Sequence, residues 1–210
     1  MGSNLSPALA YLICTYYERR IPKLIPQARL SRIFGARYMD DILIARILQH
    51  DDPTLNDLLD TDLGKIVNTT HPQAIYHKNL TIKPETDDRG ALCLGTLIYH
   101  TESGLLDIRY LNKNETSLAT TGHQKILRFQ HIASYTATPQ KMGTIIGEIT
   151  RILRLTTRWS DVLAQIELLL SELLTLGYTL TMIKRIVMGK FNKTGDSKWT
   201  RIYKHLHTLA

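Results

Sequence analysis

The sequence predicts an α+β fold, with short antiparallel strands and helices in its first half and helices in its second. Residues 33–38 and 42–48 are two apolar runs separated by Met39-Asp40-Asp41, which is the pattern of a β-hairpin. Residues 142–153 instead repeat apolar side chains at helical spacing. The 210 residues are enough for one large domain or two small ones.

The composition is that of a globular protein: 43% of the residues are hydrophobic and 21% are charged. No run is long and apolar enough to span a bilayer, and no signal peptide is recognisable, so we expect no membrane partner. Cys14 and Cys93 form neither a metal motif nor a disulfide framework. We therefore expect an intracellular, reducing compartment, with an organelle such as the mitochondrion and the nucleus left open.

Positive charge is concentrated near the end of the chain. The net charge is +7, and between residues 184 and 204 one acid, Asp196, stands against seven basic residues: Lys184, Arg185, Lys190, Lys193, Lys198, Arg201 and Lys204. A polyanion is the natural partner of such a patch. The alternative is a basic tail that is simply solvated.

The first predicted element is a helix whose body, residues 8–17, is apolar nearly all round, which favours burial. Ser6 can cap this helix, and Pro7 suits its first turn, where no backbone donor is needed. Gly2 and Ser3 form the loop before it. An ordinary capped core helix is the alternative to a functional loop.

The predicted hairpin follows the helix and places two adjacent carboxylates, Asp40 and Asp41, at its bend. Two neighbouring carboxylates repel each other, and a hard divalent cation such as Mg²⁺ relieves that repulsion. Asp40 and Asp41 are therefore candidate metal ligands. A plain polar turn is the alternative.

The middle of the chain predicts a helix and then strands. Leucines recur at helical spacing over residues 55–63, with aspartates on the solvated face. Residues 75–82, 92–99 and 105–111 have strand patterns, and we expect the last two to pair across the turn at 101–104. Residues 112–130 are polar and irregular.

The helix over residues 142–153 has two different faces. Its apolar face carries Met142, Ile145, Ile146, Ile149 and Leu153, whereas the opposite side carries Arg151, Arg154 and Arg158. Such an arginine face can follow phosphates along a groove, although simple solvation is the alternative.

Two further helices complete the prediction. The first covers 161–176, begins after Ser160 and ends at Gly177, and the second covers 180–188. In the segment that follows, Phe191, Trp199 and Tyr203 alternate with lysines. These aromatic rings can stack on unpaired bases, or they can pack onto the helices before them.

Two motifs in this order resemble those of reverse transcriptases. The family has a Gly-x-x-x-Ser-Pro loop, which is similar to Met1-Gly2-Ser3-Asn4-Leu5-Ser6-Pro7, and a Tyr-x-Asp-Asp hairpin, which is similar to Tyr38-Met39-Asp40-Asp41. The wording of the first motif resembles the Penelope-like, telomerase-like branch, as do Ser134 followed by Lys141 and then Gly177-Tyr178. The chain departs from that branch where Cys93-Leu94-Gly95 replaces Phe-Leu-Asp and where Thr179 replaces a proline.

The resemblance implies a right-hand polymerase palm without its fingers over residues 1–112. A connector and helical thumb over 113–188 and a basic tail over 189–210 would follow. It also implies catalytic roles for Asp40 and Asp41 as Mg²⁺ ligands, and places Tyr38 near the primer end. Gly2 and Ser3 would then lie near the incoming nucleotide and the template.

In the family, the first catalytic aspartate lies on a strand before the Gly-x-x-x-Ser-Pro loop, and the 210 residues hold no counterpart of that strand. Two-metal catalysis needs that group, so we expect this chain to be catalytically incomplete alone. A palm without its first strands would also expose a sheet edge, and we expect a second polypeptide or a large assembly to cover it.

The sequence therefore predicts an RNA-binding protein derived from a reverse transcriptase, acting as a structural part of a ribonucleoprotein, for instance a ribosomal one. Its ligand would be RNA or an RNA/DNA hybrid, contacted by the arginines at 151, 154 and 158 and by the basic residues of 184–204, with Trp199 stacking on bases. One alternative is the C-terminal half of a split or cropped RNA-directed DNA polymerase that uses Mg²⁺. Another is a protein-interaction scaffold that binds no nucleic acid.

Overall fold

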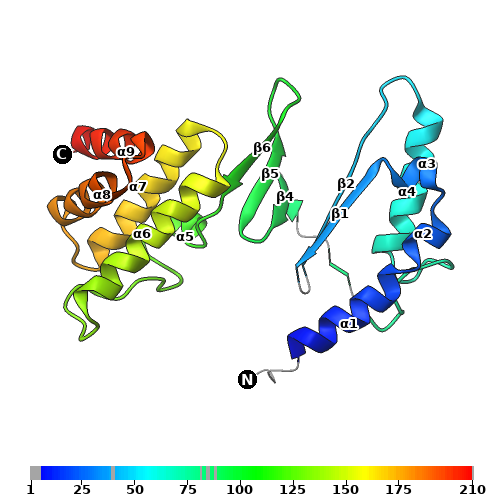
Figure 1. Ribbon diagram of the computed structural model, residues 1–210, viewed down its shortest axis with the longest axis horizontal. Helices are drawn as coiled ribbons and strands as arrows, with labels where there is room; N and C mark the ends of the chain where they lie inside the picture. Colours follow the sequence, from blue (N-terminus) through cyan, green and yellow to red (C-terminus); the bar gives the residue numbers. More distant parts are fainter. Residues whose placement is uncertain (1–5, 39–40, 81, 84–85, 88, 210) are drawn as a thin grey trace. The chain divides into compact units, whose positions relative to one another are not determined.

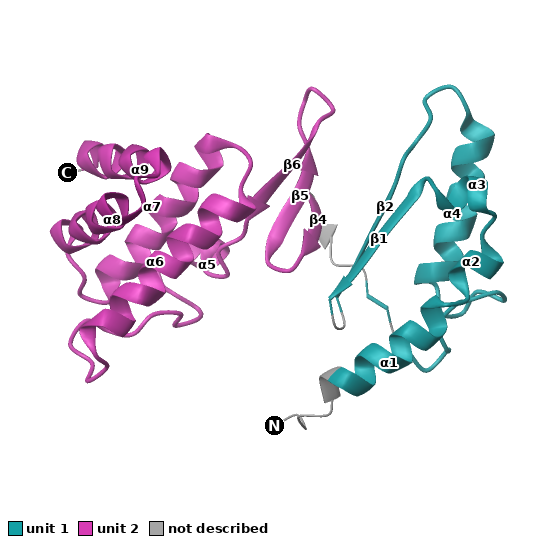
Figure 2. Cartoon of the chain, in the orientation of Figure 1, with its two compact units in different colours: residues 1–85 teal, residues 86–210 magenta. Residues whose placement is uncertain are grey.

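The chain divides into two compact units, residues 1–85 and residues 86–210 (Figure 2). The computed structural model describes residues 6–38, 41–80, 82–83, 86–87 and 89–209. The α+β prediction is confirmed, because two small antiparallel sheets and their helices precede a helical C-terminal region (Figure 1). The described strands form two separate sheets rather than one, so the polymerase palm remains a proposal.

Unit 1 consists of short helices around a two-stranded sheet. Its helices are α1 (Ser6–Glu18), α2 (Ile21–Leu24), α3 (Gln27–Leu30) and α4 (Pro53–Val67). The hairpin is formed by β1 (Ile33–Tyr38) and β2 (Asp41–Arg46), which are antiparallel from Ile33↔Arg46 to Tyr38↔Asp41. Both the hairpin and α4 were predicted, and the carboxylate of Asp52 caps α4 by accepting a bond from the Leu55 amide at 2.9 Å.

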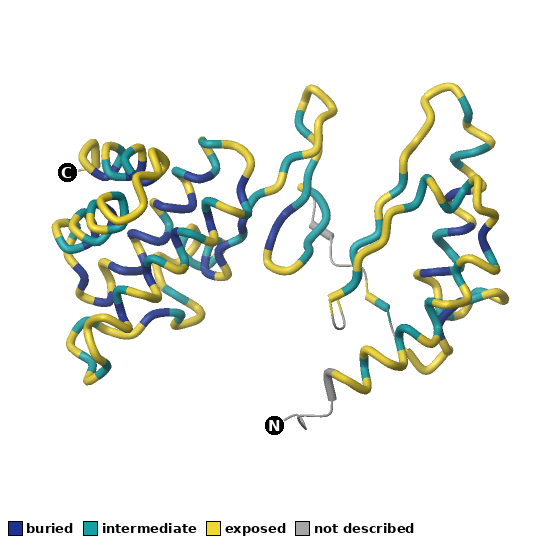
Figure 3. Tube along the Cα trace, in the orientation of Figure 1, coloured by how far each residue is buried: buried dark blue, intermediate teal, exposed yellow. Residues whose placement is uncertain are grey.

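The core of unit 1 is small and leaves much of α1 exposed. Ile25, Ile66, Ile75 and Tyr76 are buried, and α1 packs against them through Cys14 and Tyr17. Much of α1 is exposed (Figure 3). Its other apolar residues are 49–69% exposed: Leu9, Tyr11, Leu12, Ile13 and Tyr16. The prediction of a buried helix is therefore wrong for most of α1, because unit 1 packs against one side of it and a helix that is apolar all round needs neighbours on every side.

Unit 2 begins with a four-stranded antiparallel sheet in the order β3-β4-β5-β6. Its strands are β3 (Thr86–Asp87), β4 (Gly90–Cys93), β5 (Thr96–His100) and β6 (Leu106–Tyr110). The predicted hairpin across 101–104 is confirmed as β5–β6, paired from Thr96↔Tyr110 to His100↔Leu106.

Two strand predictions need correction. The run 92–99 is two strands rather than one, because the backbone turns at Leu94 and Gly95, both with positive φ (51° and 74°). In the run 75–82, the described residues form no strand. Their apolar pattern reflects burial instead, because Ile75 and Tyr76 lie in an irregular segment and pack into the core of unit 1.

The helices of unit 2 share one core. They are α5 (Glu115–Thr121), α6 (Thr138–Leu155), α7 (Trp159–Thr175), α8 (Leu180–Thr194) and α9 (Ser197–Thr208). Side chains from α6 to α9 bury one another in a single cluster, which includes Ile145, Leu173, Val187 and Ile202. As predicted, α7 is followed by Gly177 in the left-handed conformation, with φ of 83°.

The two compact units divide after residue 85, because β6 packs on α6 and α7 and so joins the sheet to the helices. The palm over residues 1–112 and the thumb over 113–188 stay predictions. The segment 189–210 is not a tail, since it contains the end of α8 and the whole of α9. Helix α9 is capped by the Asp196 carboxylate and buries Trp199, Ile202 and Leu206.

Candidate nucleic-acid interface

The structure describes only some of the residues that resemble a polymerase site. Gly2, Ser3 and Asp40 lie outside the described residues. Asp41 opens β2, is exposed, and lies opposite Tyr38 across the hairpin. Among the described residues, no group of three or more His, Cys, Asp or Glu side chains is placed to hold a metal ion. Binding of Mg²⁺ by Asp40 and Asp41 stays a prediction.

Arg37 ties the hairpin to α1 within unit 1. Its Nε donates to Glu18 Oε1 at 2.6 Å, and its guanidinium lies 5.2 Å from the centre of the Tyr11 ring. The Tyr76 hydroxyl donates to the same carboxylate oxygen at 2.8 Å. Burial and this hydrogen bond raise the pKa of Tyr76 well above its usual value. These contacts hold the strand that carries Tyr38 against the first helix.

The three predicted arginines of the α6 region have different surroundings. Arg151 lies over the Tyr110 ring at 5.3 Å, and Arg158 lies 3.7 Å from Asp107. Helix α6 ends at Leu155, so Arg158 belongs to the start of α7 and not to the α6 face. Arg154 is exposed and makes no ion pair within the described part of the chain. The arginine face of α6 therefore comprises Arg151 and Arg154, and a nucleic-acid contact of all three arginines stays a prediction.

The basic residues of 184–204 lie on α8 and α9, which pack against each other. Within the described ranges, none of the seven forms an ion pair with an acid. Arg185, Lys193, Lys198, Arg201 and Lys204 are exposed, whereas Lys184 and Lys190 are partly buried. The guanidinium of Arg201 lies 3.9 Å from the centre of the Trp159 ring, a cation–π contact that fixes its position.

These two helices account for all the excess charge of unit 2. Residues 86–183 contain nine basic and nine acidic residues, so their formal charge is zero. Residues 184–204 contain seven basic residues and one acid. Positive potential is thus concentrated on α8 and α9, where five of the seven cations are also exposed.

The aromatic residues of the same segment pack inward. Trp199 is 3% exposed and belongs to the core of unit 2, and Phe191 and Tyr203 pack against that core. Trp199, Ile202 and Leu206 recur at helical spacing on one face of α9, which explains their burial. The prediction that Trp199 stacks on bases is therefore not supported. The structure shows the alternative, in which Trp199 packs onto the other helices of unit 2.

A buried ionic network was missed by sequence reasoning. Glu172 is 0% exposed and accepts hydrogen bonds from Asn112 at 3.1 Å, from Asn114 at 2.5 Å and from Arg128. Arg128 also contacts Glu148. The network joins the polar segment 112–130 to α6 and α7. The available signal was an acid among the leucines of α7, together with asparagines in a segment that looked like a plain loop.

The network also includes Tyr110, whose hydroxyl donates to Glu148. Burial, with this hydrogen bond, raises the pKa of Tyr110 to about 12. The tyrosine therefore remains neutral at physiological pH and acts as a donor. Its ring lies beneath Arg151, so the network supports one of the predicted contact residues.

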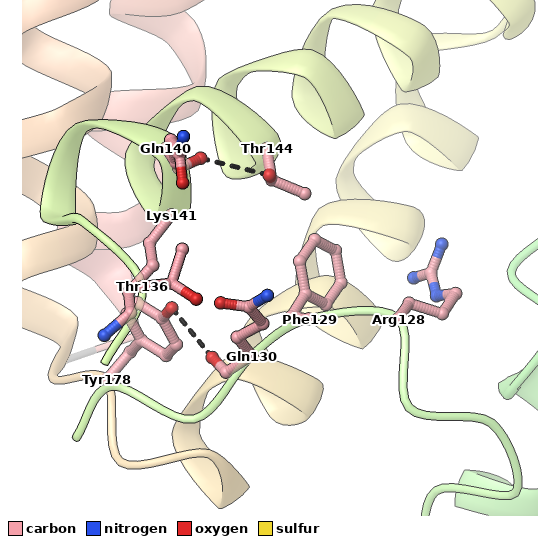
Figure 4. A pocket seen from close by; sticks show the side chains of 8 residues that line it. All are labelled: Arg128, Phe129, Gln130, Thr136, Gln140, Lys141, Thr144 and Tyr178. Carbon is pink, nitrogen blue, oxygen red and sulfur yellow. Dashed lines mark hydrogen bonds between the residues drawn. The ribbon is translucent and has the colours of Figure 1, made fainter. Parts of the chain in front are cut away.

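A cavity of about 260 Å³ lies beside this network, between segment 128–136, the start of α6 and Tyr178 (Figure 4). Lys141 lines it and is 6% exposed. Its Nζ donates to the backbone oxygens of Ile132 at 2.6 Å and Ser134 at 2.7 Å. The Ser134 and Lys141 that resembled a family motif are thus joined directly, and the ammonium group serves to hold this loop on α6.

No helix in the described ranges combines the length and the apolar character needed to cross a membrane. Comparison with known proteins gave no matching family model, no matching curated protein and no matching solved structure.

Proposed function

We propose that this chain is an RNA-binding protein of reverse-transcriptase descent that serves as a structural component of a ribonucleoprotein. The observation that carries this proposal is the distribution of charge. The cations of α8 and α9 supply the whole excess of unit 2, and within the described residues they are not neutralised by acids. Nucleic-acid phosphates supply the missing negative charge.

Helix α9 offers the main contact for RNA in this proposal. Lys198, Arg201 and Lys204 are exposed along it, and Arg201 is held in place by Trp159. Arg154 of α6 is a further exposed cation. Because Trp199 is buried, phosphate contacts rather than base stacking would supply the affinity. Binding should therefore depend strongly on salt and weakly on sequence.

The salt dependence of RNA affinity tests this proposal. Binding of a labelled single-stranded RNA to the full chain would be measured by fluorescence anisotropy at several salt concentrations. Three neutralised phosphates should give a log–log slope of about −2, since each contributes about 0.7 for a single strand. A flat dependence would contradict the proposal. The same measurement with an RNA/DNA hybrid would show whether the ligand class extends to it.

The exposed apolar residues of α1 support a further part of the proposal, that a second polypeptide or a large assembly covers unit 1. Phe34 of β1 and Tyr38 beside the bend are exposed as well. A surface of this kind is typical of a contact face. Crosslinking of the native complex through cysteines introduced at Leu12 and Phe34 should recover one defined neighbour. Recovery of none would refute this part.

The hairpin favours a second candidate function, RNA-directed DNA polymerase activity that uses Mg²⁺. Tyr38 and Asp41 are paired in register, with two residues, one of them Asp40, between them. In this case the native complex would extend a primer with Mg²⁺, and Asp41→Asn would abolish extension while leaving RNA affinity unchanged. Absence of extension by the native complex would exclude this candidate.

A further inference from the structure

A groove lies between α6 and α8, and its floor is apolar rather than basic. It encloses about 400 Å³. Met142 and Ile146 of α6 and Met182 and Ile186 of α8 line it, and all four are partly buried. Methionine is flexible and polarizable, so a methionine-rich floor adapts to different apolar side chains.

The edge of the groove is basic. Arg185, Lys190 and Lys193 of α8 line it, and none of the three pairs with an acid in the part of the chain that the structure describes. The groove therefore combines an apolar floor with uncompensated positive charge along the α8 side. An occupant that matches both features has apolar side chains flanked by carboxylates.

The spacing of the lining residues sets the shape of that occupant. Helix α6 contributes Thr138, Met142 and Ile146, which are four residues apart and extend over about 12 Å at 1.5 Å per residue. Helix α8 contributes Met182, Ile186 and Gly189 alongside them. A third helix, with apolar side chains at i, i+3 or i+4, and i+7, matches a groove two turns long. Gly189 has no side chain there, which leaves room for such a helix.

We propose that the α6–α8 groove binds an acidic amphipathic helix of a partner protein. The apolar floor distinguishes this partner from RNA, because a phosphate backbone would cover Met142, Ile146, Met182 and Ile186 without burying apolar surface of its own. The proposal does not depend on RNA binding, for which α9 offers the main contact.

A synthetic helix provides the probe. A labelled 16-residue peptide, with leucines at i, i+3 or i+4, and i+7 and glutamates on both flanks, would be titrated with the full chain in a fluorescence anisotropy assay. We expect saturable binding. A peptide with the same leucines and with lysines in place of the glutamates should bind at least about tenfold more weakly, because like charges then meet at the groove edge.

Two pairs of variants locate the binding site. Gly189→Phe places a ring in the groove, and it is tolerated locally because a Cβ at Gly189 has no atom within 4 Å. It should weaken peptide binding about tenfold or more. Gly147→Phe on α6 is the matched control, since Gly147 is also open and does not line the groove. Likewise Lys193→Glu should weaken binding, whereas Lys204→Glu on α9 should not.

The results separate a protein groove from a nucleic-acid surface. Loss of peptide binding in Gly189→Phe, with RNA affinity unchanged, supports the proposal. Absence of saturable peptide binding, or equal binding by Gly189→Phe and Gly147→Phe, would overturn it. Loss of RNA affinity in Lys193→Glu together with no peptide binding would assign the groove edge to RNA instead. These outcomes are independent of the salt test, so either proposal can fail alone.

Discussion

Glu172 is a buried carboxylate in the helical core of unit 2, and its hydrogen-bond partners stabilise its negative charge. Every hydrogen-bond partner described for its carboxylate is a donor: Asn112, Asn114 and Arg128. A buried carboxylate with several donors is stable, whereas a buried donor without an acceptor is costly. The network therefore orders segment 112–130, which has few apolar side chains to do so.

The first prediction follows from this donor arrangement. Glu172→Gln replaces a carboxylate oxygen with an NH₂ group that faces other donors, and it leaves Arg128 without its buried counter-charge. We expect a loss of about 3 kcal/mol in the free energy of unfolding of unit 2, measured by urea denaturation. Glu167→Gln, on the same helix but half exposed and bonded to His205, is the control and should cost under about 1 kcal/mol. Equal losses would contradict this account.

Asp62 plays a comparable part in unit 1. It is buried and accepts bonds from Arg29 Nε at 2.6 Å and Lys65 Nζ at 2.9 Å. Burial alone would raise the pKa of its carboxyl group, but these two cations outweigh burial and lower the pKa below 3.8. The stability that this gives is present above about pH 3.8 and is lost as pH falls through the lowered pKa.

The second prediction tests this loss of stability at low pH. Asp62→Asn should cost about 2 kcal/mol of the unfolding free energy of unit 1 at pH 7. The difference from the unmodified chain should shrink as pH falls from 3.8, where Asp62 becomes protonated in the unfolded chain, through the lowered pKa, where it becomes protonated in the folded chain. Urea denaturation at pH 7 and pH 3 would measure this, and Asp57→Asn, exposed on the same helix, should show neither effect. A difference that does not change with pH would refute it.

At the scale of elements, the sequence predicted those helices and strands that have a regular apolar pattern or a clear turn signal. The hairpin β1–β2 followed from two apolar runs around a polar bend, and α6 from a one-sided apolar pattern. The break between β4 and β5 could not be foreseen, because leucine rarely adopts the left-handed conformation that Leu94 has. Ile75 and Tyr76 were misassigned because burial alone does not distinguish a strand from a packed loop.

The candidate site was predictable to a similar extent. The basic character of α9 could be predicted from composition, because seven basic residues stand against one acid in 184–204. The contacts of Arg151 with Tyr110 and of Arg158 with Asp107 depend on packing between β6 and the helices, which spacing within the sequence does not record. The burial of Trp199 was foreseeable, because Trp199, Ile202 and Leu206 form an apolar helical face.

The third prediction concerns the end of α7. Gly177 has φ of 83°, and a Cβ there would lie 2.8 Å from Ile132 Cγ2. Gly195, which follows α8, has φ of 67° but open space around it. Both alanine variants should lose about 1 kcal/mol because of the left-handed backbone, and Gly177→Ala should lose about 1 kcal/mol more because of the clash. Thermal unfolding would compare the two, and equal losses would show that Ile132 moves aside freely.

At the scale of the whole molecule, charge is located on specific elements rather than spread over the chain. Unit 1 contains ten basic and nine acidic residues, so six of the seven net positive charges belong to unit 2, and these lie on α8 and α9. Binding driven by overall net charge would respond to charge changes anywhere on the surface. Binding at a defined face responds to changes at that face.

The fourth prediction separates these two cases. Lys198→Glu with Lys204→Glu, both on α9, lowers the net charge from +7 to +3, as does Lys113→Glu with Lys125→Glu elsewhere on the surface of unit 2. We expect the α9 pair to weaken RNA binding at least about tenfold at 0.15 M salt and to make the salt slope about 1.4 shallower, since two phosphate contacts are lost. The control pair should change affinity less than about threefold and leave the slope intact, because charges beyond the Debye length act weakly. If both pairs weaken binding equally, the chain attracts RNA through its overall charge, and no helix of unit 2 can be assigned as the contact face.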